Sequence, residues 1–154
     1  MDNSCQIRKA GPEDLPALLS LYAQLGQDDG SVLSPQDAAA LLARIATYPD
    51  YQIRLALLDD RPVGTLALLV MDNLAHAGSR SAVVEDVVVD ASVRGRGIGR
   101  LLMEDAARIA RAKGCYKIVL NSNDNRHDAH RFYRTLGYRN HGTSFFVPLE
   151  TSDA

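Results

Sequence analysis

The chain has 154 residues, of which 46% are hydrophobic and 23% charged, the ordinary profile of one globular domain, here spanning residues 1–154. No run approaches the roughly 18 apolar residues of a membrane-spanning helix. Residues 1–11 also lack an apolar export signal, so we expect a cytoplasmic protein with no membrane partner. A net charge of −2 argues against a nucleic-acid partner. Two cysteines are too few for a disulfide framework, and His127 and His130 lack further metal ligands.

The first part of the chain predicts a strand and two helices. Residues 6–10 are typical of a short strand, and residues 11–14 begin a helix because a proline and two acids favour its first turn. The apolar stripe of this helix is Leu15, Leu18, Leu19 and Tyr22. Ser34 as N-cap and Pro35 at the first helical position predict a second helix. Its inward-facing side chains are Leu41, Leu42 and Ile45.

Three strands are predicted next. Residues 51–58 and 63–70 form a hairpin through the turn residues 59–62. Residues 72–80 form a polar loop. Residues 83–89 are nearly all apolar, which favours a central strand that is buried on both faces.

The C-terminal part alternates helices and strands. A helix that begins within a glycine-rich loop ends at Gly114, and residues 116–121 form a strand. Residues 128–136 form a helix that Gly137 ends, and residues 145–147 form a last strand. This order predicts an α/β fold, a single mixed sheet with helices on its faces.

The glycine-rich loop is the most specific motif in the chain. Residues 87–99 read VVVDASVRGRGIG, which is a strand, a loop and a helix start. Unpaired backbone N–H groups at a helix start bind anions, and glycines let the backbone approach a ligand. The loop carries Gly95, Gly97, Gly99, Arg94 and Arg96. The loop does not match the P-loop, which needs Lys-Ser or Lys-Thr after its glycines. It does not match the dinucleotide-binding motif G-x-G-x-x-G either, because the third glycine of that motif would fall at position 100, which is Arg100.

Charge is distributed unevenly around this loop. Residues 94–139 hold eleven Lys and Arg against four Asp and Glu, a local net charge of +7, while the remainder carries −9. A basic half suits an anionic cosubstrate. Several of these arginines are equally explained as a solvated helix surface.

The pattern R-x-x-G-x-G at Arg94, Gly97 and Gly99 resembles the acyl-CoA pyrophosphate loop of the GNAT superfamily of N-acetyltransferases. The element order is also that of the GNAT fold. A second GNAT motif, N-x-x-A-x-x-F-Y-x-x-x-G-F/Y, is matched at Ala129, Phe132, Tyr133, Gly137 and Tyr138. Arg126 stands where the motif has Asn, and Asn123 or Asn125 can supply that amide.

Two subgroups are similar in sequence. The segment that begins at Asn123 resembles aminoalkylphosphonate acetyltransferases, whereas EDVVVDASVRGRGIGRLL and GCYKIVLN resemble glucosamine-6-phosphate N-acetyltransferases. The resemblance implies a mixed, mostly antiparallel sheet that splays between its fourth and fifth strands and about four flanking helices. It implies acetyl-CoA as cosubstrate, direct transfer in a ternary complex and a homodimer. The residues implied in binding acetyl-CoA are Val87, Val88, Val89, Arg94, Gly95, Arg96, Gly97, Ile98, Gly99, Arg100, Asn121, Asn123, Arg126, His130 and Phe132.

Three side chains are candidate catalytic groups. The resemblance places the Tyr133 hydroxyl near the CoA sulfur, as an acid for the leaving thiolate, although a tyrosine that packs on the sheet fits the same position. Glu85 and Asp86 interrupt an apolar strand, which is costly for unpaired carboxylates. Strand side chains alternate between faces, so only one should reach the acceptor unless a bulge intervenes. We favour Glu85 as the base; a structural ion pair is the alternative for both.

The acceptor is the least determined part of the reaction. A small primary amine is favoured because acidic residues occur in the segments that should shape its pocket, residues 24–38 and 72–80. An amino sugar phosphate and a protein or peptide are alternative acceptors. A non-catalytic acyl-CoA-binding module is a further alternative, and the presence of Tyr133 argues against it.

Overall fold

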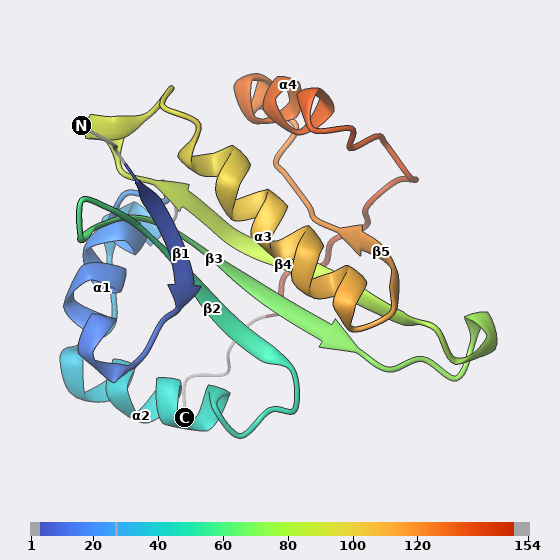
Figure 1. Ribbon diagram of the computed structural model, residues 1–154, viewed down its shortest axis with the longest axis horizontal. Helices are drawn as coiled ribbons and strands as arrows, with labels where there is room; N and C mark the ends of the chain where they lie inside the picture. Colours follow the sequence, from blue (N-terminus) through green and yellow to red (C-terminus); the bar gives the residue numbers. More distant parts are fainter. Residues whose placement is uncertain (1–3, 27, 150–154) are drawn as a thin grey trace. The chain divides into compact units, whose positions relative to one another are not determined.

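The computed structural model describes residues 4–26 and 28–149, which fall into two compact units that divide after Leu120. The first unit holds a five-stranded sheet in the order β1-β2-β3-β4-β5 (Figure 1). Its strands are β1 (Cys5–Lys9), β2 (Tyr51–Leu58), β3 (Arg61–Met71), β4 (Arg80–Val89) and β5 (Cys115–Val119). β1 to β4 are antiparallel neighbours, and β5 runs parallel to β4. The prediction of a mixed, mostly antiparallel sheet is confirmed.

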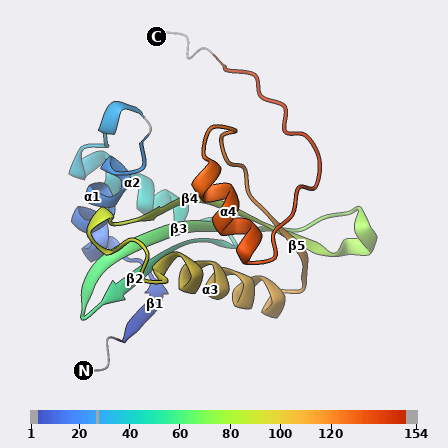
Figure 2. The same ribbon diagram turned by 90° about the horizontal axis from the view of Figure 1, so that it is seen from above.

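Helices cover both faces of this sheet. α1 (Leu15–Ala23) and α2 (Pro35–Ile45) lie on one face, and α3 (Ile98–Ala112) lies on the other (Figure 2). The predicted N-cap of α2 is present, because the Ser34 hydroxyl accepts a hydrogen bond from the Asp37 backbone N–H at 3.1 Å. On the α1 face, apolar side chains of the helices and the sheet form a core of Leu18, Leu21, Ile53, Leu55 and Val88.

A buried ion pair joins the sheet to α3. The Arg54 guanidinium on β2 donates from Nε to Asp105 on α3 at 2.7 Å, and both side chains are less than 10% exposed. Asp105 also accepts from Arg108 at 2.6 Å. Gly64 on β3 lets α3 approach closely, since a Cβ there would lie 3.1 Å from a Leu102 methyl group. These contacts hold α3 against β2 and β3.

The sheet splays between β4 and β5, as predicted. Pairing of the two strands covers Arg80 to Val83 only, whereas β4 continues to Val89. Strand pairing otherwise satisfies backbone N–H and C=O groups. Within the described part of the chain, residues 84–89 therefore have one edge without a β5 partner.

The second unit contains α4 (His127–Thr135), which ends before Gly137 at φ 88°. The predicted strand at residues 145–147 is wrong: this segment is irregular, and Phe145 and Phe146 are 92% and 88% exposed. Aromatic and branched side chains favour strands only where a neighbouring strand pairs with them, and no described residue does so here. Among the described helices, none is long and apolar enough to cross a membrane.

Candidate active site

The loop before α3 has the backbone of an anion site. Gly97 is the N-cap of α3 with φ 82°, and Gly95 has φ 79°, a region that disfavours other residues. No atom lies within 4 Å of a Cβ built on either glycine, so the backbone there is open to a ligand. Because Gly97 has no side chain to cap the helix, the first N–H groups of α3 remain available to an anion.

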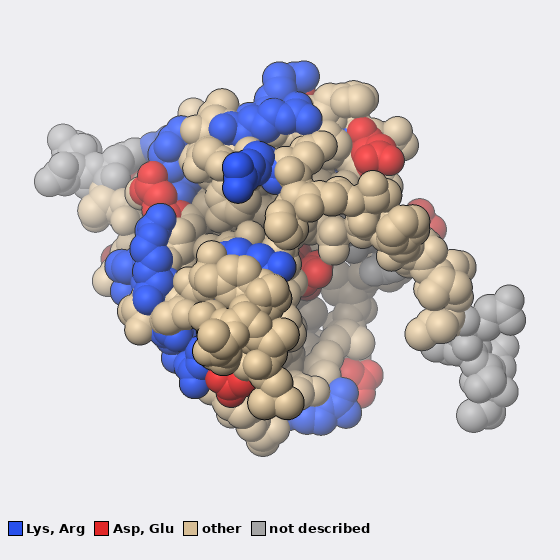
Figure 3. All heavy atoms as spheres, turned by 90° about the vertical axis from the view of Figure 1, so that its right-hand side faces the viewer, with Lys and Arg blue, Asp and Glu red and all other residues tan. Residues whose placement is uncertain are grey.

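The side chains of this loop differ in their surroundings. Arg94 and Arg96 are exposed, and Arg94 donates from Nε to the Val89 carbonyl at 3.3 Å. Arg100 lies 3.8 Å from Glu104. Ile98 is 3% exposed, so only its backbone can meet a ligand. Figure 3 shows the right-hand side of Figure 1, away from this loop, and there too Lys and Arg side chains occupy more of the surface than Asp and Glu.

The free edge of β4 presents the backbone of alternate valines. The Asp90 N–H donates to the Val63 carbonyl at 2.8 Å, so Asp90 faces β3. Val88 lies two residues earlier and pairs with Thr65, which makes its backbone groups face β3 as well. The backbone groups of Val87 and Val89 therefore point to the edge that β5 has left.

A β-bulge brings both candidate carboxylates to one face. Glu85 pairs with Ala67 and Val88 with Thr65, so Asp86 and Val87 together lie opposite a single residue. Asp86 has φ 53°, which is unusual for a residue other than glycine. Glu85 shares the face of Ala67, and Ala67 and Asp86 line the same cavity. The sequence predicted that only one of the two carboxylates would reach the acceptor unless a bulge intervened. The bulge is present, and both carboxylates reach the α1 face.

The electrostatics of this pair suit proton transfer. Burial, followed by the charge of Asp86, raises the pKa of Glu85, and burial raises the pKa of Asp86. Both side chains nevertheless remain accessible to solvent. A carboxylate with a raised pKa is a better base near neutral pH than an ordinary one. No ion pair in the described residues involves either group, so the structure lends no support to a structural ion pair here.

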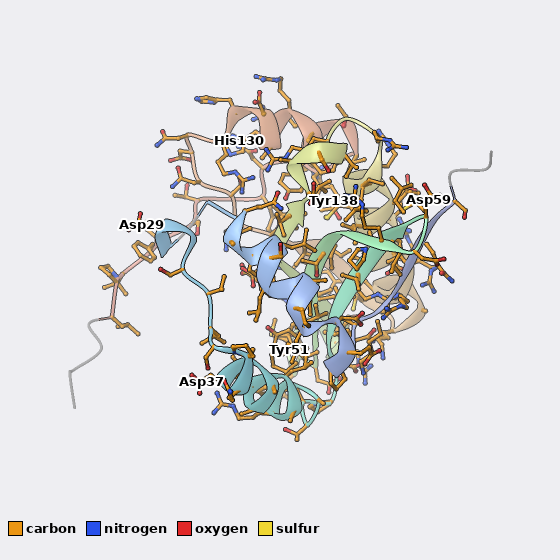
Figure 4. The ribbon with its side chains drawn as sticks, turned by 90° about the vertical axis from the view of Figure 1, so that its left-hand side faces the viewer. Asp29, Asp37, Tyr51, Asp59, His130 and Tyr138 are labelled. Atoms are coloured by element: carbon orange, nitrogen blue, oxygen red, sulfur yellow. The ribbon has the colours of Figure 1, made fainter. Side chains whose placement is uncertain are left out.

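A cavity of about 310 Å³ lies between α1, α2 and the sheet. Leucines of both helices form its walls, Ile53 and Ala67 its floor, and Val32 and Leu33 belong to the loop that joins the helices. Figure 4 shows Tyr51 between α1 and α2. The predicted segment 24–38 thus contributes to the cavity. Residues 72–80, which we also expected to shape it, contribute nothing to its lining, because they project beyond the ends of β3 and β4.

Two tyrosines of the cavity were not recognised as site residues from sequence. Burial, then the charge of Asp86, raises the pKa of Tyr22 to about 12, while hydrogen bonding to Thr65 opposes the rise. Burial, then the charges of Asp86 and Glu85, raises the pKa of Tyr51. Both hydroxyls therefore keep their protons near the carboxylates. A tyrosine within a leucine stripe was the available signal, since a buried hydroxyl usually has a polar neighbour.

The remaining predicted residues lie in the second unit. Asn121 is exposed and follows the end of β5, and the Asn123 side chain accepts from the Asn125 N–H at 3.0 Å. Arg126 is the N-cap residue of α4, and its carbonyl accepts from the His130 N–H at 3.0 Å. Asn123, Arg126 and His130 therefore lie at or next to the start of α4, and Asn121 lies in the irregular segment that precedes it.

Tyr133 is half-buried on α4 among aromatic rings. Its ring centroid lies 5.2 Å from that of Phe132 and 6.0 Å from that of Tyr138. Burial raises the pKa of Tyr133, and the positive charge of Arg126 opposes this. The hydroxyl is therefore protonated at neutral pH, as an acid for a thiolate must be.

These features define an acetyltransferase of the GNAT type, and comparison with known families agrees. The family described as Acetyltransferase (GNAT) family matches residues 18–138, so the chain belongs to this family. The resemblance inferred from the two motifs is thereby confirmed. The assignment as a GNAT-family N-acetyltransferase is also confirmed, since the relatives described below are named as N-acetyltransferases.

Both subgroups recognised from sequence occur among the relatives. Aminoalkylphosphonate N-acetyltransferase of Salmonella typhimurium is 33% identical over 137 residues, which are 88% of this chain and 85% of that protein. Glucosamine 6-phosphate N-acetyltransferase of Trypanosoma brucei brucei is 41% identical over 81 residues, 53% of each, so the match spans about half of that relative. A crystal structure of a Trypanosoma brucei acetyltransferase matches at 30% identity with a TM-score of 0.81, covering 95% of this chain and 100% of that one.

Proposed function

We propose that the protein transfers an acetyl group from acetyl-CoA directly to the primary amine of a small molecule, within a ternary complex. One observation carries the proposal: β4 combines a backbone edge that β5 leaves unpaired at Val87 and Val89 with the carboxylates Glu85 and Asp86, and it leads into the open helix start at Gly97. GNAT proteins generally use acetyl-CoA. A cosubstrate with a pyrophosphate and an amide-bearing arm needs this combination.

The residues of the first unit fit acetyl-CoA. The N–H groups and charges of residues 94–100 would hold the pyrophosphate, and the free edge at residues 87–89 would pair with the amides of the pantetheine arm. We assign the other contacts with the cosubstrate to residues of the second unit, Asn121, Asn123, Arg126, His130 and Phe132. The match of the family over residues 18–138 runs through both units, which supports a single domain.

In the proposed reaction the amine nitrogen attacks the thioester carbonyl carbon, so that a C–N bond forms and the C–S bond breaks. Glu85, or Asp86, takes the proton from the amine directly or through a water. An N–H of Val87 or Val89 donates to the carbonyl oxygen as negative charge develops there. Tyr133 gives its proton to the departing thiolate. The products are an amide and free CoA.

An amino sugar phosphate is the second candidate acceptor, because a relative at 41% identity is named for glucosamine 6-phosphate. A peptide acceptor and a non-catalytic acyl-CoA-binding module remain alternatives to be tested with it. A cytoplasmic location and a homodimer complete the proposal.

Thiol release from acetyl-CoA, measured across amines, amino sugar phosphates, aminoalkylphosphonates and peptides, tests this function. We expect release above the background without acceptor, and a fall of about 100-fold or more in kcat for Tyr133→Phe. Tyr116→Phe, at a half-exposed tyrosine on β5, is the matched control and should keep full activity. Saturable acetyl-CoA binding without release for any acceptor would support the binding module instead.

A further inference from the structure

The cavity beside β4 has a composition that selects among amines. Its walls and floor are leucine, isoleucine, valine and alanine side chains, and among the described residues that line it Asp86 alone carries a charge. We infer that the acceptor is a primary amine on an apolar body, such as an arylalkylamine or alkylamine, and not a phosphorylated or phosphonylated amine. This inference rests on the proposed function and narrows its substrate.

The size of the cavity fits such a body. Its volume of about 310 Å³ is twice that of the ~150 Å³ apolar cavity that accommodates benzene, and it lies at the lower end of ligand pockets. Val32 and Leu33, in the loop between α1 and α2, are 46% and 47% exposed although they are apolar. Side chains of this kind at a cavity lose their contact with water when an apolar ligand enters, which favours binding.

One end of the cavity suits an ammonium group. The bulge turns Asp86 into the cavity beside Tyr22 and Tyr51, whose pKa values are raised by burial and then by the charge of Asp86. An amine at this position meets the Asp86 carboxylate and the two tyrosine hydroxyls in a cavity that is otherwise mainly apolar, where charge attraction is stronger than in water. It also lies next to Glu85 and the free edge of β4, where acetyl transfer is proposed. The apolar body then points away between α1 and α2.

The same cavity opposes a phosphate. Phosphate sites use arginine, lysine or a free helix N-terminus. No lysine or arginine is among the described residues of the lining. The start of α2, which reaches the cavity at Ala38, is capped by Ser34 and carries the Asp37 carboxylate 2.8 Å from the Ser34 hydroxyl. An anion in the cavity would meet the Asp86 carboxylate, with no cation among the described lining residues to pair with it.

A comparison of different amine acceptors tests this inference directly. We would measure kcat/KM with 2-phenylethylamine, n-alkylamines of increasing length, 2-aminoethylphosphonate and glucosamine 6-phosphate, and the binding of each amine alone by calorimetry. We expect 2-phenylethylamine to exceed both phosphorus-containing acceptors by at least tenfold. Along the n-alkylamines, kcat/KM should rise about fourfold per methylene until the cavity is full.

A pair of matched variants tests whether the preference for an apolar amine arises in this cavity. Leu33→Ser should weaken 2-phenylethylamine binding and kcat/KM about threefold to tenfold and leave acetyl-CoA binding unchanged. Leu74→Ser, at an apolar residue that is fully exposed and outside the cavity, should change neither. Turnover that favours the phosphorylated acceptors, or an equal effect of both substitutions, would overturn the inference while the acetyltransferase function stands. Selective binding of the apolar amine without turnover would support the inferred pocket and overturn the proposed function.

Discussion

Gly97 offers the sharpest test of the proposal that the loop before α3 binds acetyl-CoA. Its φ of 82° and ψ of 3° place the N-cap of α3 in the left-handed region, where a side chain costs about 1–2 kcal/mol. A Cβ at Gly97 would meet no atom within 4 Å, so Gly97→Ala introduces backbone strain without a clash. The loop is exposed, and nothing around it forces an alanine to keep this conformation.

The strain should therefore appear as lost affinity for acetyl-CoA. An alanine relaxes the loop and turns the N–H groups of α3 away, and the ligand must restore them at a cost of about 1–2 kcal/mol. This corresponds to an increase of about 5–30-fold in the Kd of acetyl-CoA. Titration calorimetry with acetyl-CoA measures this Kd, and urea unfolding measures the accompanying change in stability.

Gly114 is the matched control at the other end of α3. It has φ 75° and equally open space around its Cβ position, so Gly114→Ala carries the same strain far from the loop. We expect it to lose similar stability and to bind acetyl-CoA as the unchanged protein does. A Kd for Gly97→Ala within twofold of that for Gly114→Ala would show that the start of α3 is not the pyrophosphate site.

Three further predictions concern stability. Asp105→Asn leaves the buried Arg54 without its charge partner and should lower the free energy of unfolding by about 3–5 kcal/mol in urea, whereas replacing both residues by leucine and methionine should recover most of it. Gly64→Ala should destabilise by about 1–3 kcal/mol in the same assay, because its Cβ would lie 3.1 Å from Leu102 and 3.2 Å from a backbone oxygen. Burial raises the pKa of Asp86, so the folded protein retains a proton that the unfolded chain has released, and stability falls as pH rises through both values. Asp86→Asn should therefore raise Tm at about pH 7 but not at about pH 2, which is below the carboxyl range; an equal rise at both would contradict the assigned cause.

Local signals in the sequence predicted most of the fold. Ser34 before Pro35 marks the start of α2 because the capping hydrogen bond is formed within four residues. The apolar run of β4 identifies a central strand, since strands buried on both faces lack alternation. The segment 145–147 is also apolar but forms no strand, because pairing depends on a neighbour that composition does not reveal.

The candidate site was predictable only in part. The glycines of residues 95–99 are recognisable because a left-handed backbone restricts the choice of residue. The face of the sheet to which Asp86 points could not be predicted. It depends on the alignment of β3 against β4, where Asp86 and Val87 lie opposite a single residue of β3. The charge of the cavity was also not predictable, because its lining comes from five separate segments of the chain.

The position of the thiols supports direct transfer over an acyl-enzyme. Cys115 pairs with Arg80 at the start of β4, six residues before Asp86, which is a separation of about 20 Å along the strand. Cys5 lies on β1, three strands away in the sheet. Burial raises the pKa of both thiols, so neither is an activated nucleophile. The carboxylates at the bulge and the free edge of β4, by contrast, occupy the same few residues, so in the proposed reaction an amine and a thioester bound there would meet without an intermediate carrier.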